Sequence, residues 1–240
     1  MSELILVRHG QSIWNLQNRF TGWYDVELSG NGLSEAKIAG QLLVKKNIRI
    51  DFAYTSYLKR ANSTLKIILE NMKLENIGFT KSWEFNERHY GSLTGLNKSE
   101  MKEQLGEEKI KIYRRSWDIA PPELSEDSEF NPRNDIIYNG INEDAIPNTE
   151  SLKDTYDRVI PYFNINIRPK ILAGKNVIIA AHGNSLRALC KLLFNISNEN
   201  INKLEIPTGN PLLVKLDSDL KFISAYYLDE TRAQTIIQNK

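Results

Sequence analysis

The stretch Leu4-Ile5-Leu6-Val7-Arg8-His9-Gly10-Gln11-Ser12 decides the fold that we expect for this chain. Its four consecutive apolar residues predict a buried strand, and Arg-His-Gly follows directly where that strand would end. In open α/β sheets, ligands bind at the carboxyl ends of the strands, where the amino-termini of the helices also open. The stretch therefore predicts an α/β protein whose chemistry is centred on His9.

A second stretch repeats this arrangement. Residues 176–181 predict another buried strand, which runs into His182-Gly183-Asn184-Ser185 and then into the helical segment 186–194. If the two strands are neighbours in a parallel sheet, both histidines face one crevice, and backbone amides of two helices point into it. Such amides form a cradle for a phosphate group.

The hydrophobic pattern between these stretches predicts alternating helices and strands. One helix begins between Ser29 and Ser34, and another has Ser56 at or just before its cap and Arg60 in its first turn. Further strands are predicted at 52–55 and 79–83, with edge strands at 211–216 and 222–227; helices are predicted at 97–116, broken near Gly106, and at 152–171, bent at Pro161 or ended near Pro169. We expect residues 1–240 to form a single domain, a three-layer sandwich with a mostly parallel central sheet flanked by helices.

Two segments stand outside this pattern. Residues 117–147 contain four prolines and scattered acids without a sustained period, which predicts a long surface excursion that acts as a lid or a binding surface. The polar tail at 229–240 carries no motif that we can assign.

Composition limits the partners of the protein. The chain has 31 basic and 30 acidic residues, so its net charge of +1 gives no reason to expect nucleic acid or an anionic membrane surface. The single cysteine, Cys190, excludes an intramolecular disulfide and suits a reducing compartment. No apolar run approaches the ~18 residues of a membrane helix, and we see no signal-peptide pattern. We expect a cytoplasmic protein that builds any anion site locally.

The paired histidines have two other interpretations. Together with Glu87 they would suffice as zinc ligands, but Arg8, Arg60 and Arg88 would share the pocket, and their charges oppose a cation. They could also be core histidines that are hydrogen-bonded at strand ends. The repeated His-Gly junction and the arginines argue against that interpretation, and we expect no metal.

The chemistry that fits these residues is attack by a neutral imidazole nitrogen on phosphorus, which gives a phosphohistidine. Arginine suits the transferring group because its planar fork binds two phosphate oxygens and stays protonated. A leaving alkoxide also needs a proton, and Glu87 is the best acid in the chain. The alternative for Glu87 is an ordinary ion pair with Arg88.

Taken together, these residues resemble the histidine phosphatase superfamily and, more closely, its 2,3-bisphosphoglycerate-dependent phosphoglycerate mutases. The likeness covers nearly the whole chain. Besides the two His-Gly junctions and Asn15, it rests on Arg19-Phe20-Thr21-Gly22-Trp23, Tyr54-Thr55-Ser56, Leu58-Lys59-Arg60-Ala61, Asn86-Glu87-Arg88-His89-Tyr90-Gly91, Gly95-Leu96-Asn97-Lys98, Arg114-Arg115, Pro121-Pro122, Thr149-Glu150-Ser151-Leu152 and Ile206-Pro207-Thr208-Gly209.

The resemblance implies a role for each site residue. His9 would be phosphorylated, Glu87 would give and take the proton, and His182, Arg8 and Arg60 would stabilise the transferring group. The same phosphate would be held by Asn15, Gly183 and Asn184, with Ser12 beside it. The second phosphate and the carboxylate of the glycerate would be held by Thr21, Gly22, Arg88, Tyr90, Lys98, Arg114 and Arg115.

The resemblance also implies the fold, the reaction and the assembly. It implies the phosphoglycerate mutase-like fold, 3-phosphoglycerate and 2-phosphoglycerate as substrates, 2,3-bisphosphoglycerate as primer and intermediate, no metal, and a homodimer or homotetramer. The sequence departs from the family at Gln11, where glutamate is usual and we expect a mild effect. Residues 131–138 lack the family's usual glycine-histidine and second proline.

Charge separates a mutase from a phosphatase on these residues. A bisphosphate that must stay bound while it reorients carries about −1.5 to −2 per phosphate, so it needs cations beyond those at His9. Lys98, Arg114 and Arg115 are the candidates, but adjacent helical residues point about 100° apart, so the two arginines share a ligand only if their helix ends there. The alternatives are a phosphomonoesterase that uses the same His9 and Glu87, and a non-catalytic module that binds a phosphorylated ligand.

Overall fold

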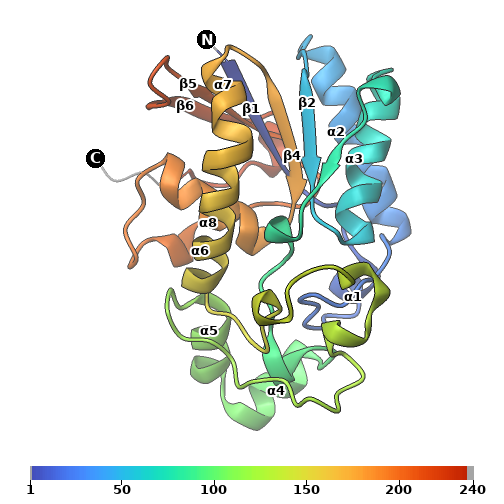
Figure 1. The fold of residues 1–240 in the computed structure, drawn as a ribbon, viewed down its shortest axis with the longest axis vertical. Helices are drawn as coiled ribbons and strands as arrows, with labels where there is room; N and C mark the ends of the chain where they lie inside the picture. The colour runs from blue at the N-terminus through green and yellow to red at the C-terminus, as the bar shows by residue number, and fades with distance from the viewer. Residues whose placement is uncertain (1, 237–240) are drawn as a thin grey trace.

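A six-stranded sheet forms the centre of the computed structural model, which describes residues 2–236 (Figure 1). Its strands are β1 (Ser2–Arg8), β2 (Phe52–Thr55), β3 (Thr80–Lys81), β4 (Val177–Ala181), β5 (Leu212–Leu216) and β6 (Phe222–Tyr227). They lie in the order β3-β2-β4-β1-β5-β6. The pairs β3-β2, β2-β4 and β4-β1 are parallel, whereas β5 is antiparallel to both β1 and β6, so the sheet is mixed.

The two histidine-bearing strands are parallel neighbours, which is the condition for both histidines to face one crevice. The register runs from Leu4 opposite Val177 to Arg8 opposite Ala181, and the His9 amide donates to the Ala181 carbonyl over 2.9 Å. Residues 4–7 of β1 and all of β4 are apolar, because a strand segment that is covered on both faces has no side for water. His9 and His182 therefore leave the sheet side by side.

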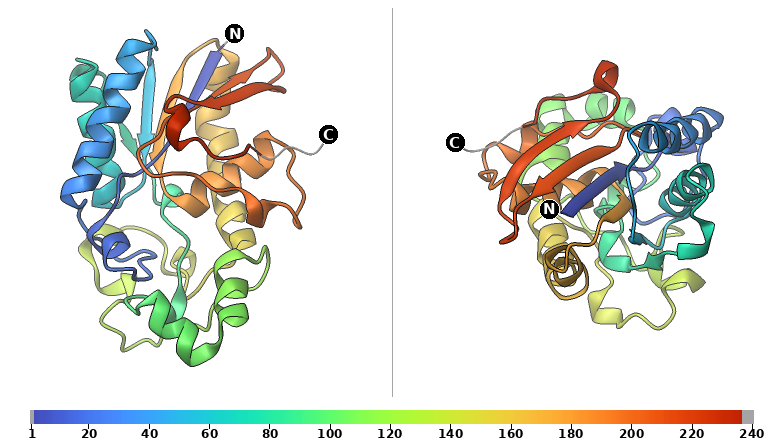
Figure 2. Two further views of the ribbon diagram at one scale, coloured as in Figure 1. Left: turned by 180° about the vertical axis from the view of Figure 1, so that it is seen from behind. Right: turned by 90° about the horizontal axis from the view of Figure 1, so that it is seen from above.

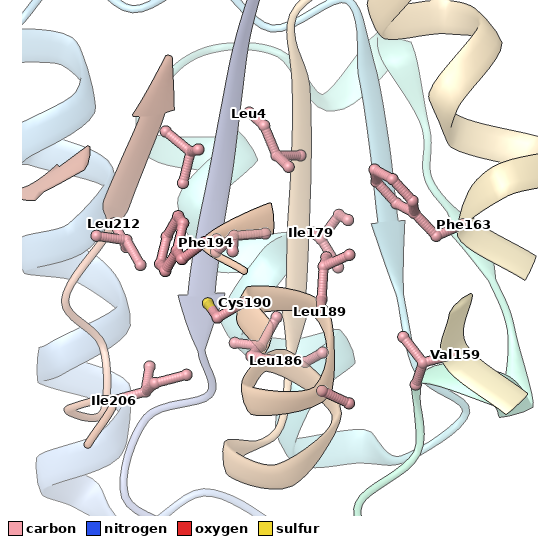
Figure 3. Close-up of a cluster of buried hydrophobic side chains, with 14 of the residues drawn as sticks. Leu4, Val159, Phe163, Ile179, Leu186, Leu189, Cys190, Phe194, Ile206 and Leu212 are labelled. Atoms are coloured by element: carbon pink, nitrogen blue, oxygen red, sulfur yellow. The ribbon is translucent and has the colours of Figure 1, made fainter. Parts of the chain in front are cut away.

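Helices cover both faces of the sheet. On one face, α2 (Gly30–Lys45) and α3 (Lys59–Asn71) pack on Ile5 and Val7; on the other, α6 (Leu152–Tyr162), α7 (Arg168–Leu172) and α8 (Gly183–Leu193) pack on Leu4 and Leu6 (Figure 2). Successive side chains of β1 therefore point into opposite helical layers, because side chains alternate between the two faces of a strand. Figure 3 shows the second layer, in which Leu189 of α8 lies beside Ile179 of β4 and Cys190 belongs to the same cluster.

A group of short elements lies beyond the carboxyl ends of the parallel strands, in the lower part of Figure 1. It contains α1 (Ile13–Leu16), α4 (Lys98–Leu105) and α5 (Glu107–Arg115), so the predicted break at Gly106 is confirmed. Residues 117–147 run past them as loops with three short 3₁₀ turns. This excursion is anchored by Tyr138, which is buried and donates its hydroxyl to the Trp23 carbonyl over 2.7 Å.

Two predictions of elements need correction. The strand predicted at 79–83 is only two residues long, because Trp83–Phe85 turns as a 3₁₀ helix at an exposed edge of the sheet. The strand predicted at the edge over 211–216 is instead internal, since β5 pairs on both sides.

The long helix predicted at 152–171 is present and ends at Leu172, near Pro169. Helical backbone continues past both Pro161 and Pro169, and a five-residue π-helix at Phe163–Ile167 lies between α6 and α7. A proline has no N–H to donate to the preceding turn, and a π-helical segment is one way for a helix to absorb such a gap. Ser29, in contrast, caps α2 within the predicted window.

The carboxyl-terminal tail is fastened to the body of the protein. Arg232 lies 3.7 Å from Glu35 of α2 and donates to the Thr208 carbonyl over 3.0 Å. Residues 237–240 of the tail lie outside the described residues. Within the described part of the chain, no helix is long and apolar enough to cross a membrane.

Candidate active site

His9 stands at the carboxyl end of β1 and is 3% exposed. Its Nδ1 lies 2.7 Å from the Gly10 carbonyl oxygen. A carbonyl can only accept, so Nδ1 carries the proton. Burial, followed by the charges of Arg60 and Arg8, lowers the pKa of His9 well below its usual value. The ring is therefore neutral near pH 7, and Nε2 keeps its lone pair as a nucleophile.

His182 lies against His9, with ring centroids 4.9 Å apart at 61°. It caps α8, and its Nε2 is 2.7 Å from the Ser56 hydroxyl, which also accepts the Leu58 amide. Burial and the Arg60 charge lower the pKa of His182 well below its usual value. Its Nδ1 is buried without a hydrogen-bond partner among residues 2–236. Since buried polar atoms normally have a partner, this nitrogen is available to a polar ligand.

Two arginines supply positive charge beside the histidines. Arg60 is fully buried in the first turn of α3, as predicted, and donates to the carbonyls of Tyr24 and Gly22 over 2.9 and 2.8 Å. Arg8 donates to the Ile206 carbonyl over 2.9 Å, and its buried Nε has no partner within the described chain. Burial lowers the pKa of Arg60 to about 10, so it stays protonated at neutral pH. Since carbonyls rather than carboxylates hold these guanidiniums, their charge is available to an anion.

Glu87 is the carboxylate that faces this group. It is 8% exposed, and its Oε1 accepts the amides of Arg88 and Asn184 over 2.8 and 3.1 Å. The Arg88 guanidinium points elsewhere: it donates to the Arg114 carbonyl and lies 4.8 Å from the centre of the Tyr90 ring. The contacts that hold Glu87 are therefore backbone amides and not the ordinary ion pair with Arg88.

The backbone of the Glu87 segment is clamped by Arg158, which the sequence reasoning missed. Arg158 donates to the carbonyls of Glu84, Asn86 and Glu87 over 2.6, 3.1 and 3.1 Å. Its charge is balanced by buried Glu150, with contacts of 2.6 and 2.9 Å. Glu150 could have indicated it: a carboxylate next to the start of a helix with an apolar face is seldom buried without a partner, and Arg158 is a cation on that helix.

Two adjoining cavities open on these residues. The inner cavity, of about 80 Å³, is lined by Arg8, His9, Asn15, Arg19, Thr21, Gly22, Arg60, Glu87, Tyr90, Lys98 and Arg114. The outer cavity, of about 150 Å³, is lined by Arg8, Glu87, Tyr90, Arg114, Arg115, Gly183, Asn184, Arg187 and Glu205. Because four residues line both, they form one cleft that runs from His9 to Arg115.

The structure thus brings together most of the predicted site. α5 ends at Arg115, which is the condition for Arg114 and Arg115 to face one cavity. Lys98 donates to the Arg19 carbonyl over 2.7 Å, and burial lowers its pKa. Gly183 leaves open the space between Arg8 and Glu87, which we call the cradle. A Cβ at this position would lie 3.5 Å from Arg8 Cζ and 3.7 Å from Glu87 Oε2.

Three predicted or flagged residues lie behind the cleft wall. Ser12 caps α1 and accepts the Asn15 amide, while fully buried Arg88 supports Arg114 and Tyr90 as described above. The side chain of Gln11 accepts the Ser29 hydroxyl. None of the three lines either cavity.

Other residues of the cleft had no predicted role, namely Arg19, Arg187 and Glu205. Arg187 had a usable signal, because it lies three residues after Asn184 on one helix and such residues are neighbours. Its Nη1 donates to Asn184 Oδ1 over 2.6 Å. Ser56 contacts His182 without lining either cavity, and the sequence predicts it only as a possible cap.

The cleft combines a neutral imidazole nucleophile, a carboxylate and several cations, which is the equipment of phosphoryl transfer. Among residues 2–236, no three or more His, Cys, Asp or Glu side chains are grouped to hold a metal ion.

Comparisons with known proteins agree with this chemistry. The family model of the histidine phosphatase superfamily (branch 1) matches residues 4–135 and 125–227. A curated relative from Pelagibacter ubique (strain HTCC1062), a 2,3-bisphosphoglycerate-dependent phosphoglycerate mutase, is 52% identical over 237 residues, which are 99% of each chain.

Solved structures share the fold at low identity. A mycobacterial glucosyl-3-phosphoglycerate phosphatase in complex with VO3 superposes with a TM-score of 0.72 at 20% identity, over 95% of this chain and 97% of that one. The α-ribazole phosphatase of Shigella flexneri gives a TM-score of 0.65 at 19% identity, over 90% and 91%. Because it matches the family model and is 52% identical to a curated mutase over 99% of each chain, the chain belongs to the 2,3-bisphosphoglycerate-dependent phosphoglycerate mutases of the histidine phosphatase superfamily.

Proposed function

We propose that this protein interconverts 3-phosphoglycerate and 2-phosphoglycerate through a phosphohistidine at His9 that is primed by 2,3-bisphosphoglycerate. The observation that carries the proposal is the cleft itself. A neutral imidazole with a free Nε2 lies at one end, and Arg114 and Arg115 lie at the other. The family membership established above supports the same reaction.

The residues of the cleft fit a carboxylated bisphosphate. Besides Arg8 and Arg60 at the histidines, the lining contains Arg19, Lys98, Arg114, Arg115 and Arg187, against two carboxylates. Phosphates of about −1.5 to −2 charge each require such an excess of cations. When bound, 2,3-bisphosphoglycerate supplies the phosphoryl group that primes His9.

In the first half-reaction, phosphorylated His9 gives its phosphoryl group to the 2-hydroxyl of 3-phosphoglycerate. Glu87 takes the hydroxyl proton while the new O–P bond forms and the Nε2–P bond breaks. Arg8, Arg60 and the His182 ring hold the phosphoryl oxygens as charge shifts between nitrogen and oxygen. The imidazole leaves as a neutral ring, which its lowered pKa favours.

In the second half-reaction, Nε2 of His9 attacks the phosphorus at position 3 after the bound molecule has turned over. Glu87 returns its proton to O3 as the O3–P bond breaks, so 2-phosphoglycerate leaves and the phosphohistidine is restored. Lys98, Arg114 and Arg115 retain the anion between the two halves. The excursion over 117–147 helps to exclude water, which would otherwise take the phosphoryl group.

We also propose that the chain acts as a single domain in the cytoplasm, as a homodimer or homotetramer, without nucleic-acid or membrane partners. Its near-zero net charge supports the absence of nucleic-acid and membrane partners, and its one cysteine, Cys190, suits a reducing compartment. The assembly is proposed from the family resemblance alone.

The test measures isomerisation and phosphate release on the same sample with 3-phosphoglycerate and catalytic 2,3-bisphosphoglycerate. We expect isomerisation to exceed release by a large factor, and both to disappear in His9→Ala. Dominant release would make the protein a phosphomonoesterase with the same His9 and Glu87. Binding without either reaction would make it a non-catalytic module.

A further inference from the structure

The outer cavity contains a carboxylate that phosphoryl transfer does not use. Glu205 precedes Ile206, whose carbonyl holds Arg8. Its Oε1 lies 2.5 Å from Nη2 of Arg115, and its Oε2 lies 3.9 Å from Nη2 of Arg187. A cleft built for anions thus places an anion of its own on one of its binding arginines.

The two arginines beside Glu205 differ in how firmly they are held. The Arg187 side chain is 7% exposed, and it donates to the Leu204 carbonyl over 3.0 Å and to Asn184 Oδ1 over 2.6 Å. The Arg115 side chain is 27% exposed at the last residue of α5, and the described contact of its guanidinium is the one with Glu205. Arg187 is therefore a fixed cation and Arg115 an adjustable one.

We infer that Glu205 lowers the affinity of the cleft for anions, because its carboxylate occupies, on Arg115, the place of an anionic group of the substrate. This inference rests on the proposed function, which brings a second anionic group to that end of the cleft. When the substrate anion takes Arg115, Glu205 swings to Arg187, which lies close enough to receive it.

This exchange sets how tightly a polyanion is held. Without Glu205, Arg115 and Arg187 would face each other unbalanced in the free enzyme and would bind any extended anion strongly. With Glu205, a ligand must displace a carboxylate that is itself 45% exposed and therefore partly screened by water. An ion pair of this exposure is worth up to about fivefold in an equilibrium constant. Glu205 thus favours release of product over retention.

The test is Glu205→Gln, which keeps the size of the side chain and an oxygen for Arg115 but removes the charge. We expect the Kd of 3-phosphoglycerate, measured by calorimetry on unphosphorylated enzyme at low salt, to fall by about fivefold. Glu103→Gln makes the same change of net charge at an exposed position of α4 that lines neither cavity, and it should leave Kd unchanged.

A double variant separates competition from a structural role. In Arg115→Met, the contested cation is gone, so adding Glu205→Gln should change Kd by less than twofold. Unchanged or weaker binding in Glu205→Gln, or an equal gain in the Arg115→Met background, would overturn the inference.

Mutase turnover of the wild-type sample separates this result from the fate of the proposed function. Tighter binding in Glu205→Gln without any isomerisation by the wild type would contradict the proposed function but support the anion exchange. Isomerisation by the wild type without tighter binding in Glu205→Gln would contradict the anion exchange alone.

Discussion

Replacement of Arg158 by methionine tests how the segment that carries Glu87 is held. The guanidinium makes three hydrogen bonds to the carbonyls of Glu84, Asn86 and Glu87 and two contacts with buried Glu150. Methionine fills much of the volume but leaves a 3% exposed carboxylate at Glu150 without its cation. Removal of one partner of a buried pair costs about 3–5 kcal/mol of unfolding free energy.

The same change should reduce catalysis by the molecules that remain folded. The Glu87 carbonyl loses its donor, so the backbone that positions the carboxylate is held less firmly, and a misplacement of about 1 Å costs on the order of 100-fold in rate. The assay combines urea unfolding with turnover below the unfolding transition. Because the proposed mechanism places Glu87 in the reacting step, kcat should fall more than KM changes.

Arg168→Met is the matched control, since Arg168 is exposed on α7 and outside the cleft. It should alter stability by less than about 0.5 kcal/mol and leave kcat unchanged. If Arg158→Met unfolds at the same urea concentration as this control and retains full kcat, then the clamp does not position Glu87.

Three further substitutions test buried groups. Burial and then the Arg158 charge lower the pKa of His89 to about 3, whereas the unfolded chain binds this proton near 6.5. The free energy of unfolding is therefore highest above pH 6.5 and declines as pH falls, by roughly 2 kcal/mol at pH 5 for this group, and His89→Gln should flatten that decline in denaturant titrations. Gly183→Ala should fold as well as the wild type, with stability unchanged or raised by about 0.4–1 kcal/mol, but lose phosphoenzyme formation because its Cβ fills the cradle; normal labelling would contradict the assignment of that space. Tyr138→Phe should cost about 1–3 kcal/mol in urea unfolding by leaving the Trp23 carbonyl unpaired, while Tyr57→Phe serves as the control, and equal losses would mean that the hydroxyl does not anchor the excursion.

The sequence predicted the parts of the fold that depend on local pattern. Two apolar runs, each followed by His-Gly, sufficed for neighbouring parallel strands, because a strand that is covered on both faces must be apolar throughout. The internal position of β5 was not predictable, since an apolar strand of five residues looks the same at an edge and inside a sheet. The two-residue length of β3 likewise depends on where the chain leaves the sheet.

The residues of the site also differ in whether the sequence could predict them. Residues at strand ends and helix starts, such as His9 and His182, were predictable because topology fixes where those positions meet. Arg88 lies beside Glu87 in sequence, yet its side chain turns behind the wall, and adjacent positions in a loop do not reveal this direction. The partners of Glu205 come from α5 and α8, so their approach depends on tertiary packing.

The most direct test of the mechanism is the location of a transferred phosphoryl group. Enzyme incubated with 2,3-bisphosphoglycerate that is labelled in its phosphates should take up one acid-labile phosphoryl group per chain. Peptide mapping should place that group on His9, and added 3-phosphoglycerate should remove it into bisphosphate and 2-phosphoglycerate. Label on another residue, or turnover that persists in His9→Ala, would contradict the account.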